Sequence, residues 1–194
     1  FKGSLTSIEV ANAVEIGIKN VFPQCNVIKT NVADGGEGTV EAIIKSLGGD
    51  LYTTAVTDPL GRPIEAEYGV VNLNGVKTAV IEMSSASGLP LLLPDEQNPW
   101  ITSTYGTGEM ILDALNRGCR KFLVGIGGSA TNDAGTGMLS ALGVKFFDSQ
   151  GLRLKGCGKD LKSIAQIDMS SLVPEARKSE FIVACDVNTP FCGL

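Results

Sequence analysis

Hydrophobic positions recur every three or four residues near the start of the chain, between Ile8 and Phe22. This is the spacing of one face of an α-helix. Thr6 and Glu9 fit a capping box at the beginning of the helix, and Pro23 stops it. Similar patterns, with glycine at one end or both, predict further helices over residues 40–47, 106–115 and 138–142.

Strand-like runs separate these helices. Residues 122–126 are almost continuously apolar, as in a buried parallel strand. Residues 64–71 and 76–83 are joined by a turn that contains Asn74-Gly75, a hairpin signal. Other strands are predicted over 26–32, 51–57, 144–147 and 181–185. The expected fold class is therefore α/β, with an antiparallel insert that makes the sheet mixed.

Four segments are rich in hydroxyl or carboxylate residues, and the first three of them also contain glycine. We call them the first to fourth loops: residues 33–39, 104–109, 125–137 and 185–190. Glycine lets a backbone approach a ligand closely, and amides at a helix N-terminus favour anions. For any single loop a tight turn is an equally good explanation. In an open α/β sheet, however, such loops meet at one crevice, so four of them favour a site for an anionic ligand.

The composition of the chain argues against several classes of function and of catalytic site. The net charge is −5 and the basic residues are scattered, which argues against nucleic-acid binding. No apolar run is long enough to span a bilayer, and a cytoplasmic location is expected. Histidine is absent, which excludes Ser-His-Asp and Cys-His arrangements and zinc sites with histidine ligands. The five cysteines show no C-x-x-C pair and are interpreted as reduced thiols.

Acidic residues in the loops suggest a role for a divalent cation. Neither a Walker A motif nor a G-x-G-x-x-G fingerprint is present. The carboxylates nevertheless offer hard oxygen ligands, and Mg²⁺ usually takes one or two carboxylates together with substrate phosphates. Phosphoryl transfer from a nucleotide fits these groups, because an aspartate can accept the proton of the attacking hydroxyl. The carboxylates concerned are Asp34, Glu37, Asp133 and Asp186.

At these same loops the sequence resembles the bacterial glycerate kinase family of the first type. The matching segments occur in the family's order at residues 1–5, 33–39, 57–62, 104–109, 125–137 and 185–188. The resemblance implies a kinase that uses ATP and Mg²⁺ to phosphorylate D-glycerate, usually giving 2-phosphoglycerate rather than 3-phosphoglycerate. It also implies two Rossmann-like or flavodoxin-like α/β domains with the active site between them.

Length is where the chain departs from the family, whose members are nearly twice as long and begin with a strand and an Asp-Ser pair. We interpret the chain as a fragment without that strand and without a long C-terminal portion. Residues 1–58 are expected to be part of a first Rossmann-like α/β domain, completed by missing C-terminal residues. Residues 59–194 are expected to be part of a second α/β domain.

The resemblance also suggests roles for individual residues. Asp186, Asp34 and Lys2 are the expected catalytic residues, with Asp186 the first choice for general base. Asp133 is expected to bind Mg²⁺ directly or through water, and Asp186 is the other expected ligand. Substrate contacts are expected from Ser4, Glu37, Asn132, Asn188 and Arg62, although a structural role for Arg62 in its turn is equally consistent. Phosphates would be held by Gly127, Gly128, Ser129 and Thr131, and by a second group of Gly106, Thr107 and Gly108.

Two other functions stay open on this pattern. One is a kinase or phosphatase that acts on another small hydroxy acid or sugar acid. The other is a non-catalytic module that senses an anion or nucleotide, against which the retained carboxylates argue. The expected partners are the nucleotide and a small molecule such as glycerate, with no nucleic acid and no membrane. A homodimer is left open.

Overall fold

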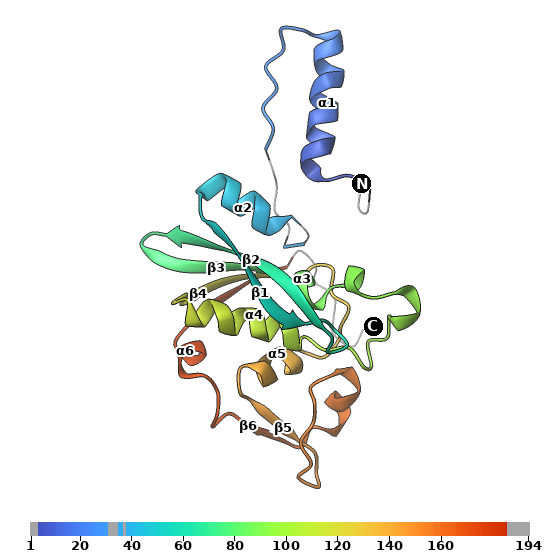
Figure 1. The fold of residues 1–194 in the computed structure, drawn as a ribbon, viewed down its shortest axis with the longest axis vertical. Helices are drawn as coiled ribbons and strands as arrows, with labels where there is room; N and C mark the ends of the chain where they lie inside the picture. The colour runs from blue at the N-terminus through green and yellow to red at the C-terminus, as the bar shows by residue number, and fades with distance from the viewer. Residues whose placement is uncertain (1–3, 31–34, 37, 186–194) are drawn as a thin grey trace. The chain divides into compact units, whose positions relative to one another are not determined.

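The computed structural model of the chain describes residues 4–30, 35–36 and 38–185. The chain divides into two compact units, Phe1–Ala33 and Asp34–Leu194 (Figure 1). In the described residues, no helix is both long and apolar enough to cross a membrane.

The first unit contains helix α1 (Ser7–Val21). Its predicted capping box is confirmed: the backbone N–H of Glu9 donates to Thr6 Oγ1 at 3.2 Å, and that of Thr6 donates to Glu9 Oε2 at 2.7 Å. Farther along the helix, Lys19 and Lys29 both donate to Glu15, and they lower the pKa of Glu15 to about 2. Local hydrogen bonds and charge pairs thus fix the helix, which buries none of its residues.

The predicted strand over 26–32 is wrong where the structure describes it, because residues 26–30 form no strand. A strand satisfies its backbone groups by pairing with another strand, and no described strand pairs with this segment. A side chain ties the segment to α1 instead. Lys29 Nζ donates to Asn12 Oδ1 at 2.8 Å and to Glu15 Oε2 at 2.7 Å.

The second unit is built on a five-stranded mixed sheet with strand order β1-β2-β3-β4-β7. The first three strands pair antiparallel, whereas β3, β4 and β7 run parallel. The hairpin between β2 and β3 turns at Asn74 and Gly75, whose φ angles of 53° and 83° are those of the predicted turn. The expected α/β class with a mixed sheet is therefore confirmed. The strands are β1 (Asp50–Thr57), β2 (Pro63–Leu73), β3 (Val76–Glu82), β4 (Lys121–Gly125) and β7 (Glu180–Ala184).

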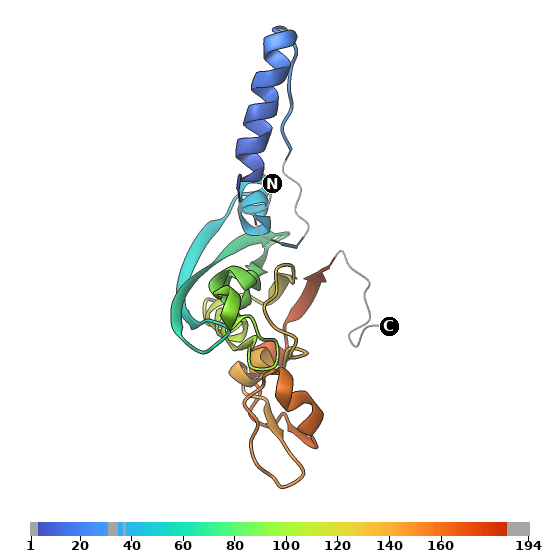
Figure 2. The ribbon, with the colours of Figure 1, turned by 90° about the vertical axis from the view of Figure 1, so that its right-hand side faces the viewer.

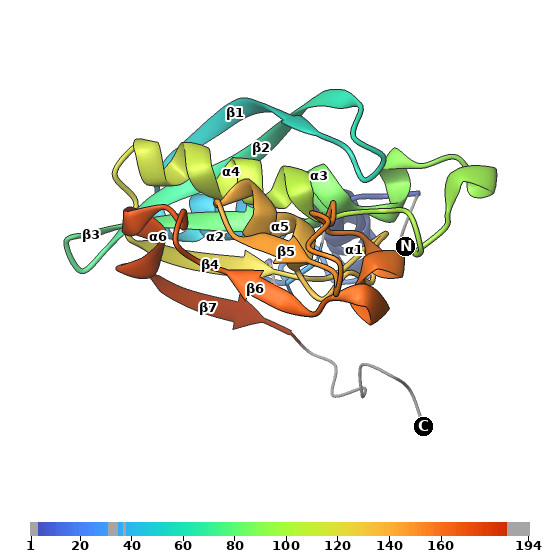
Figure 3. The ribbon, with the colours of Figure 1, turned by 90° about the horizontal axis from the view of Figure 1, so that it is seen from below.

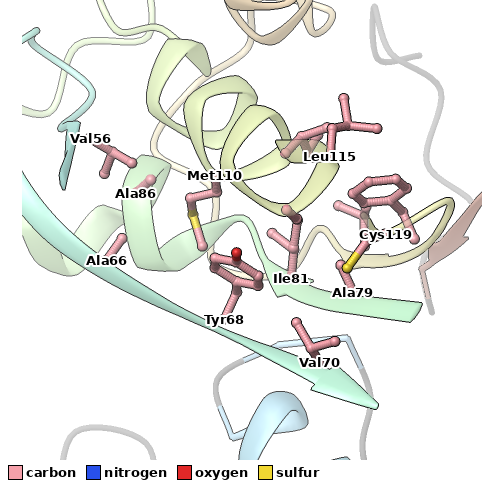
Figure 4. Packing of buried hydrophobic residues seen from close by; sticks show 14 of the residues in the cluster. Val56, Ala66, Tyr68, Val70, Ala79, Ile81, Ala86, Met110, Leu115 and Cys119 are labelled. Carbon is pink, nitrogen blue, oxygen red and sulfur yellow. The ribbon is translucent and has the colours of Figure 1, made fainter. Parts of the chain in front are cut away.

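Helices cover both faces of this sheet (Figures 1 and 3). Helix α4 (Tyr105–Asn116) packs on the face that carries the larger hydrophobic cluster, with Met110 close to Tyr68 of β2 and Ile81 of β3 (Figure 4). Helix α2 (Thr39–Leu47) packs on the other face through the smaller cluster around Val40. Successive side chains of β2, β3 and β4 point to opposite faces of the sheet, so these strands contribute apolar residues to both clusters. This is expected for a sheet buried between two helical layers.

A buried tyrosine joins the larger cluster to the surface. The ring of Tyr68 is fully buried, and its hydroxyl donates to Asp113 Oδ2 at 2.6 Å. Burial raises the pKa of Tyr68, and the hydrogen bond to Asp113 raises it further. Arg117 in turn donates to Asp113 at 2.7 Å. The polar tip of Tyr68 is thus satisfied while its ring stays in the core.

Shorter elements complete the second unit, and the sequence pattern predicted only some of them. The expected strand at 144–147 and helix at 138–142 are present, with shifted ends. The strand β6 and the helices α3, α6, η1, η2 and η3 were not predicted. Figure 2 also shows the strong curvature of the hairpin formed by β1 and β2. These elements are α3 (Ser84–Ser87), η1 (Leu89–Leu91), η2 (Pro94–Glu96), α5 (Thr136–Ala141), β5 (Lys145–Phe147), η3 (Gly158–Ser163), β6 (Gln166–Asp168) and α6 (Pro174–Arg177).

The boundary between the two compact units, after Ala33, lies well before the domain border predicted near residue 58. β1 precedes that predicted border, β2 follows it, and the two strands pair along the whole of β1, from Asp50 to Thr57. In this chain β1 therefore belongs to the same sheet as the later strands. The domain assignment for a longer polypeptide stays a prediction.

Replacing Ile81 with alanine tests the central position of β3. Ile81 is fully buried between the sheet and α4, so we expect a loss of about 2–5 kcal/mol in the free energy of unfolding. Ile167→Ala is the matched control, because Ile167 is 57% exposed and should change stability by at most about 0.5 kcal/mol. Urea denaturation measures both; equal losses would contradict the described core.

Candidate functional site

The described parts of the first and third loops meet at the carboxyl ends of β4 and β7. The backbone N–H of Gly127 donates to the carbonyl oxygen of Gly35 at 3.1 Å, which joins the third loop to the first. The N–H of Ile126 donates to the carbonyl oxygen of Ala184 at 3.4 Å, directly before the fourth loop. The meeting of the first and third loops agrees with the convergence predicted for the end of a parallel sheet, whereas the fourth loop after Cys185 lies outside the described residues.

Glycine makes the contact between the first and third loops feasible. A β-carbon at position 127 would lie 2.8 Å from Gly36 Cα, and one at position 125 would collide with the carbonyl oxygen of Gly35. Gly35 itself has a φ of 85°, which an L side chain rarely adopts. These glycines therefore allow two main chains to touch, a role distinct from the close approach to a ligand that the sequence suggested.

Glu82 is a buried residue at this end of the sheet that the sequence analysis missed. It is the last residue of β3, and its Oε1 accepts the N–H of Val40 in the first turn of α2 at 2.7 Å. A carboxylate near a helix N-terminus is stabilised by the helix dipole. The first loop is also held internally, because Gly35 N–H donates to Thr39 Oγ1 at 3.1 Å. The sequence signal that could have identified Glu82 is an acidic residue at the end of an otherwise apolar strand.

Asp133 connects the third loop to the second. Its side chain is buried, and its Oδ2 accepts the N–H of Thr104 at 2.8 Å and that of Gly137 at 3.1 Å. Oδ2 also accepts the hydroxyl of Thr104 at 2.8 Å, while Oδ1 accepts the N–H of Gly135 at 3.0 Å. Both carboxylate oxygens are therefore engaged within the protein.

Packing accounts for the residues of the second loop that were predicted to hold phosphate. Gly106 lies against the backbone of Thr57, and Gly108 lies against α5, where a β-carbon would be 2.7 Å from Ala141 Cβ. Thr107 is buried, and its hydroxyl forms a hydrogen bond of 2.8 Å with that of Ser87. Their role toward a nucleotide stays a prediction.

A hollow of about 240 Å³ lies between the second and third loops. Its lining combines apolar side chains, such as Met83 and Val124, with hydroxyl groups and the amide of Asn132. Ser129 and Thr131, two of the predicted phosphate-binding residues, line it together with the exposed Asn132; Thr131 N–H donates to Ser129 Oγ at 3.1 Å. The lining residues are Met83, Thr104, Thr107, Val124, Ile126, Ser129, Thr131, Asn132, Asp133, Ala134, Gly135 and Met138.

Of the remaining predicted site residues, some are described by the structure and others lie outside the described part of the chain. Ser4 is exposed in the first unit, two residues before the N-cap of α1. Gly128 belongs to the third loop, where its carbonyl oxygen accepts the N–H of Leu89 at 3.0 Å. Five predicted residues lie outside the described part of the chain: Lys2, Asp34, Glu37, Asp186 and Asn188.

Arg62, predicted to contact substrate, is held in its own turn. Its guanidinium donates to Glu96 Oε1 at 2.7 Å and pairs with Asp58. Hydrogen bonds to Glu96 and then Asp58 raise the pKa of Arg62. Asp58 is buried and also accepts the backbone N–H groups of Leu60 and Arg62 at 2.8 Å. These contacts support the structural alternative, and a role toward substrate stays a prediction.

The described residues do not form a metal site. No group of three or more cysteine, aspartate or glutamate side chains in the described part of the chain is arranged to hold an ion. Asp133, the one predicted ligand that is described, already accepts four hydrogen bonds. Metal binding by the loops stays a prediction, because Asp34, Glu37 and Asp186 lie outside the described residues.

Comparison with known proteins identifies the family of this α/β chain. The model of the glycerate kinase family matches residues 1–194. A glycerate kinase from Haemophilus influenzae is 48% identical, one from Bacillus subtilis is 46% identical, and the glycerate 2-kinase of Escherichia coli is 45% identical. Each alignment covers 100% of this chain and 50% of the relative. The chain therefore belongs to the glycerate kinase family.

A solved structure agrees with this assignment. The crystal structure of a glycerate kinase 2 candidate from Salmonella typhimurium LT2 matches with a TM-score of 0.80 and 42% sequence identity. The match covers 98% of this chain and 50% of that one. The chain spans about half the length of the curated relatives it matches.

Gly127→Ala tests the contact between the first and third loops. The new methyl group would press on Gly36 Cα, a backbone atom that yields only if the loops separate, so we expect a loss of about 1–3 kcal/mol in unfolding free energy. Backbone amides of both loops should exchange hydrogen faster. Gly17→Ala in α1 is the control, because nothing lies within 4 Å of its β-carbon position and a helix favours alanine. Unchanged exchange in Gly127→Ala would show that the loops do not depend on this contact.

Proposed function

We propose that the polypeptide carrying this chain is a kinase that transfers the γ-phosphoryl group of ATP to D-glycerate and forms 2-phosphoglycerate. The observation that carries the proposal is the meeting of the described first and third loops at the ends of β4 and β7, beside the hollow between the second and third loops. The substrate follows from the relatives, which are named glycerate kinases, and the 2-position from the name of the Escherichia coli relative.

The hollow suits part of a nucleotide. Met83, Val124, Ile126 and Met138 offer apolar surface to a base or sugar, while Ser129 and Thr131 offer hydroxyl groups at its edge. Its lining contains no lysine or arginine among the described residues. The phosphate charge therefore needs another source of neutralisation, and Mg²⁺ bound to ATP supplies it in most kinases. We include ATP and Mg²⁺ in the proposal for this reason.

The reaction makes few chemical demands on the protein. The attacking hydroxyl oxygen of glycerate forms a bond to the γ-phosphorus, and the bond between that phosphorus and the β–γ bridging oxygen breaks, so that ADP leaves. The hydroxyl proton passes to a carboxylate. Asp186, which comes two residues after the end of β7, is our first candidate for that base, and Asp34 beside Gly35 is the second.

We also propose that further polypeptide completes the two units. Within α1 no residue is buried, and Val14, Val21 and Phe22 are exposed apolar residues. In β7, which lies at an edge of the sheet, Ile182 and Val183 are exposed as well. Apolar surface of this kind normally lies against another element. Because the relatives are about twice as long, the other half of such a polypeptide is the occupant we propose. A cytoplasmic location and a homodimer stay predictions from the sequence.

Assay of the complete polypeptide with D-glycerate, ATP and Mg²⁺ tests the function. Phosphorus NMR should show ADP and 2-phosphoglycerate, and EDTA should stop the reaction until Mg²⁺ is restored. Asp186→Asn should lower kcat by about 10²–10⁴-fold, the usual contribution of a general base. Asp95→Asn, at an exposed aspartate in η2, is the matched control and should leave kcat unchanged. Phosphorylation of another hydroxy acid in preference to glycerate would refute the substrate assignment.

A further inference from the structure

Asp133 holds a place between two helices and two loops. Its side chain lies beside the start of α4 at Thr104 and the start of α5 at Gly135 and Gly137. The residue is 1% exposed, and no ion pair among the described residues includes it. A buried carboxylate without a cationic partner needs hydrogen bonds to offset the loss of water. Three backbone N–H groups and one hydroxyl provide them.

Thr104 extends this connection into α5. Its Oγ1 donates to Asp133 Oδ2 at 2.8 Å and accepts the N–H of Met138 at 2.9 Å. The side chains of Asp133 and Thr104 together therefore bind the first turn of α5 to the N-cap of α4. Gly137 leaves room for this contact, because a β-carbon there would lie 2.8 Å from Asp133 Oδ2 and would collide with Ser103 Oγ.

The elements that Asp133 joins are the ones that form the hollow. Thr104 and Thr107 line it from the second loop and α4, while Ser129, Thr131 and Gly135 line it from the third loop. If the hydrogen bonds of Asp133 were lost, the two sides could move relative to each other. Both carboxylate oxygens are engaged, and Oδ2 alone accepts three hydrogen bonds, so direct coordination of an ion would have to displace protein donors.

We propose that Asp133 is a positioning residue that holds the second and third loops in the arrangement that binds the nucleotide, and that it is not a ligand of the metal. This inference rests on the proposed kinase function. It replaces the role as an Mg²⁺ ligand that the sequence suggested for Asp133.

Asp133→Asn in the complete polypeptide separates the two roles. An amide that keeps its oxygen at the Oδ2 position turns its NH₂ group toward the N–H of Gly135, so at least one hydrogen bond is lost. We expect the KM for ATP to rise roughly tenfold, the size of losing one charge-assisted hydrogen bond. The KM for glycerate and the Mg²⁺ concentration that gives half-maximal rate should stay within about twofold of the wild type.

Asp113→Asn is the control for loss of a carboxylate on α4 outside the second and third loops. Asp113 Oδ2 accepts the hydroxyl of Tyr68 at 2.6 Å and an N–H of Arg117 at 2.7 Å, and Asp113 does not line the hollow. We expect it to lower stability without raising the KM for ATP. Thr104→Val should reproduce the effect of Asp133→Asn, whereas Thr104→Ser, which keeps the hydroxyl, should preserve the wild-type KM.

Hydrogen exchange without ligand and calorimetry with ATP give readouts that do not need turnover. In Asp133→Asn the amides near Thr104 and Gly135 should exchange faster, and ATP should bind roughly tenfold more weakly. A raised Mg²⁺ requirement, or an unchanged affinity for ATP, would overturn the positioning role. If the wild type binds ATP without phosphorylating glycerate, the proposed function fails alone. If it binds no ATP, both proposals fail.

Discussion

The hydrogen bonds of the Asp133 carboxylate join the two halves of the site. Four donors from three residues meet at one buried side chain, and they fix where α4 and α5 begin. A buried carboxylate is costly unless its acceptor sites are filled, so this cluster favours one arrangement of the loops over any that leaves an oxygen unpaired. The hollow lies between the second and third loops that this cluster joins.

Other acidic residues of the second unit are used in the same way. Glu82 accepts an N–H from the first turn of α2, Glu109 accepts one from Thr57, and Asp58 accepts two within its own turn. Each carboxylate satisfies backbone donors that a strand or helix leaves unpaired where it ends. Acidic residues near glycine loops therefore do not by themselves indicate a metal site. In this chain, the ones that the structure describes organise the backbone.

Glycine in the loops has a comparable explanation. Gly125 and Gly127 permit main-chain contact with the first loop, and Gly106 and Gly108 permit α4 to approach β1 and α5. In each case a β-carbon would meet atoms that cannot easily move. Because these glycines have no side chains, the loops can pack together at one end of the sheet, which a common site requires. Binding of a ligand by the same backbone would be a second consequence of this packing.

The sequence by itself determined the elements whose signals are local. The capping box of α1, the two strand-like runs that form β2 and β3, and the Asn74-Gly75 turn between them depend on neighbours in the chain, and each was predicted correctly. Tertiary structure alone decided that residues 26–30 form no strand, since a strand depends on a partner elsewhere. It also decided what Asp133 does. Its residue type allows a metal ligand or a hydrogen-bond acceptor, and only the folded chain brings Thr104 and Gly137 to its oxygens.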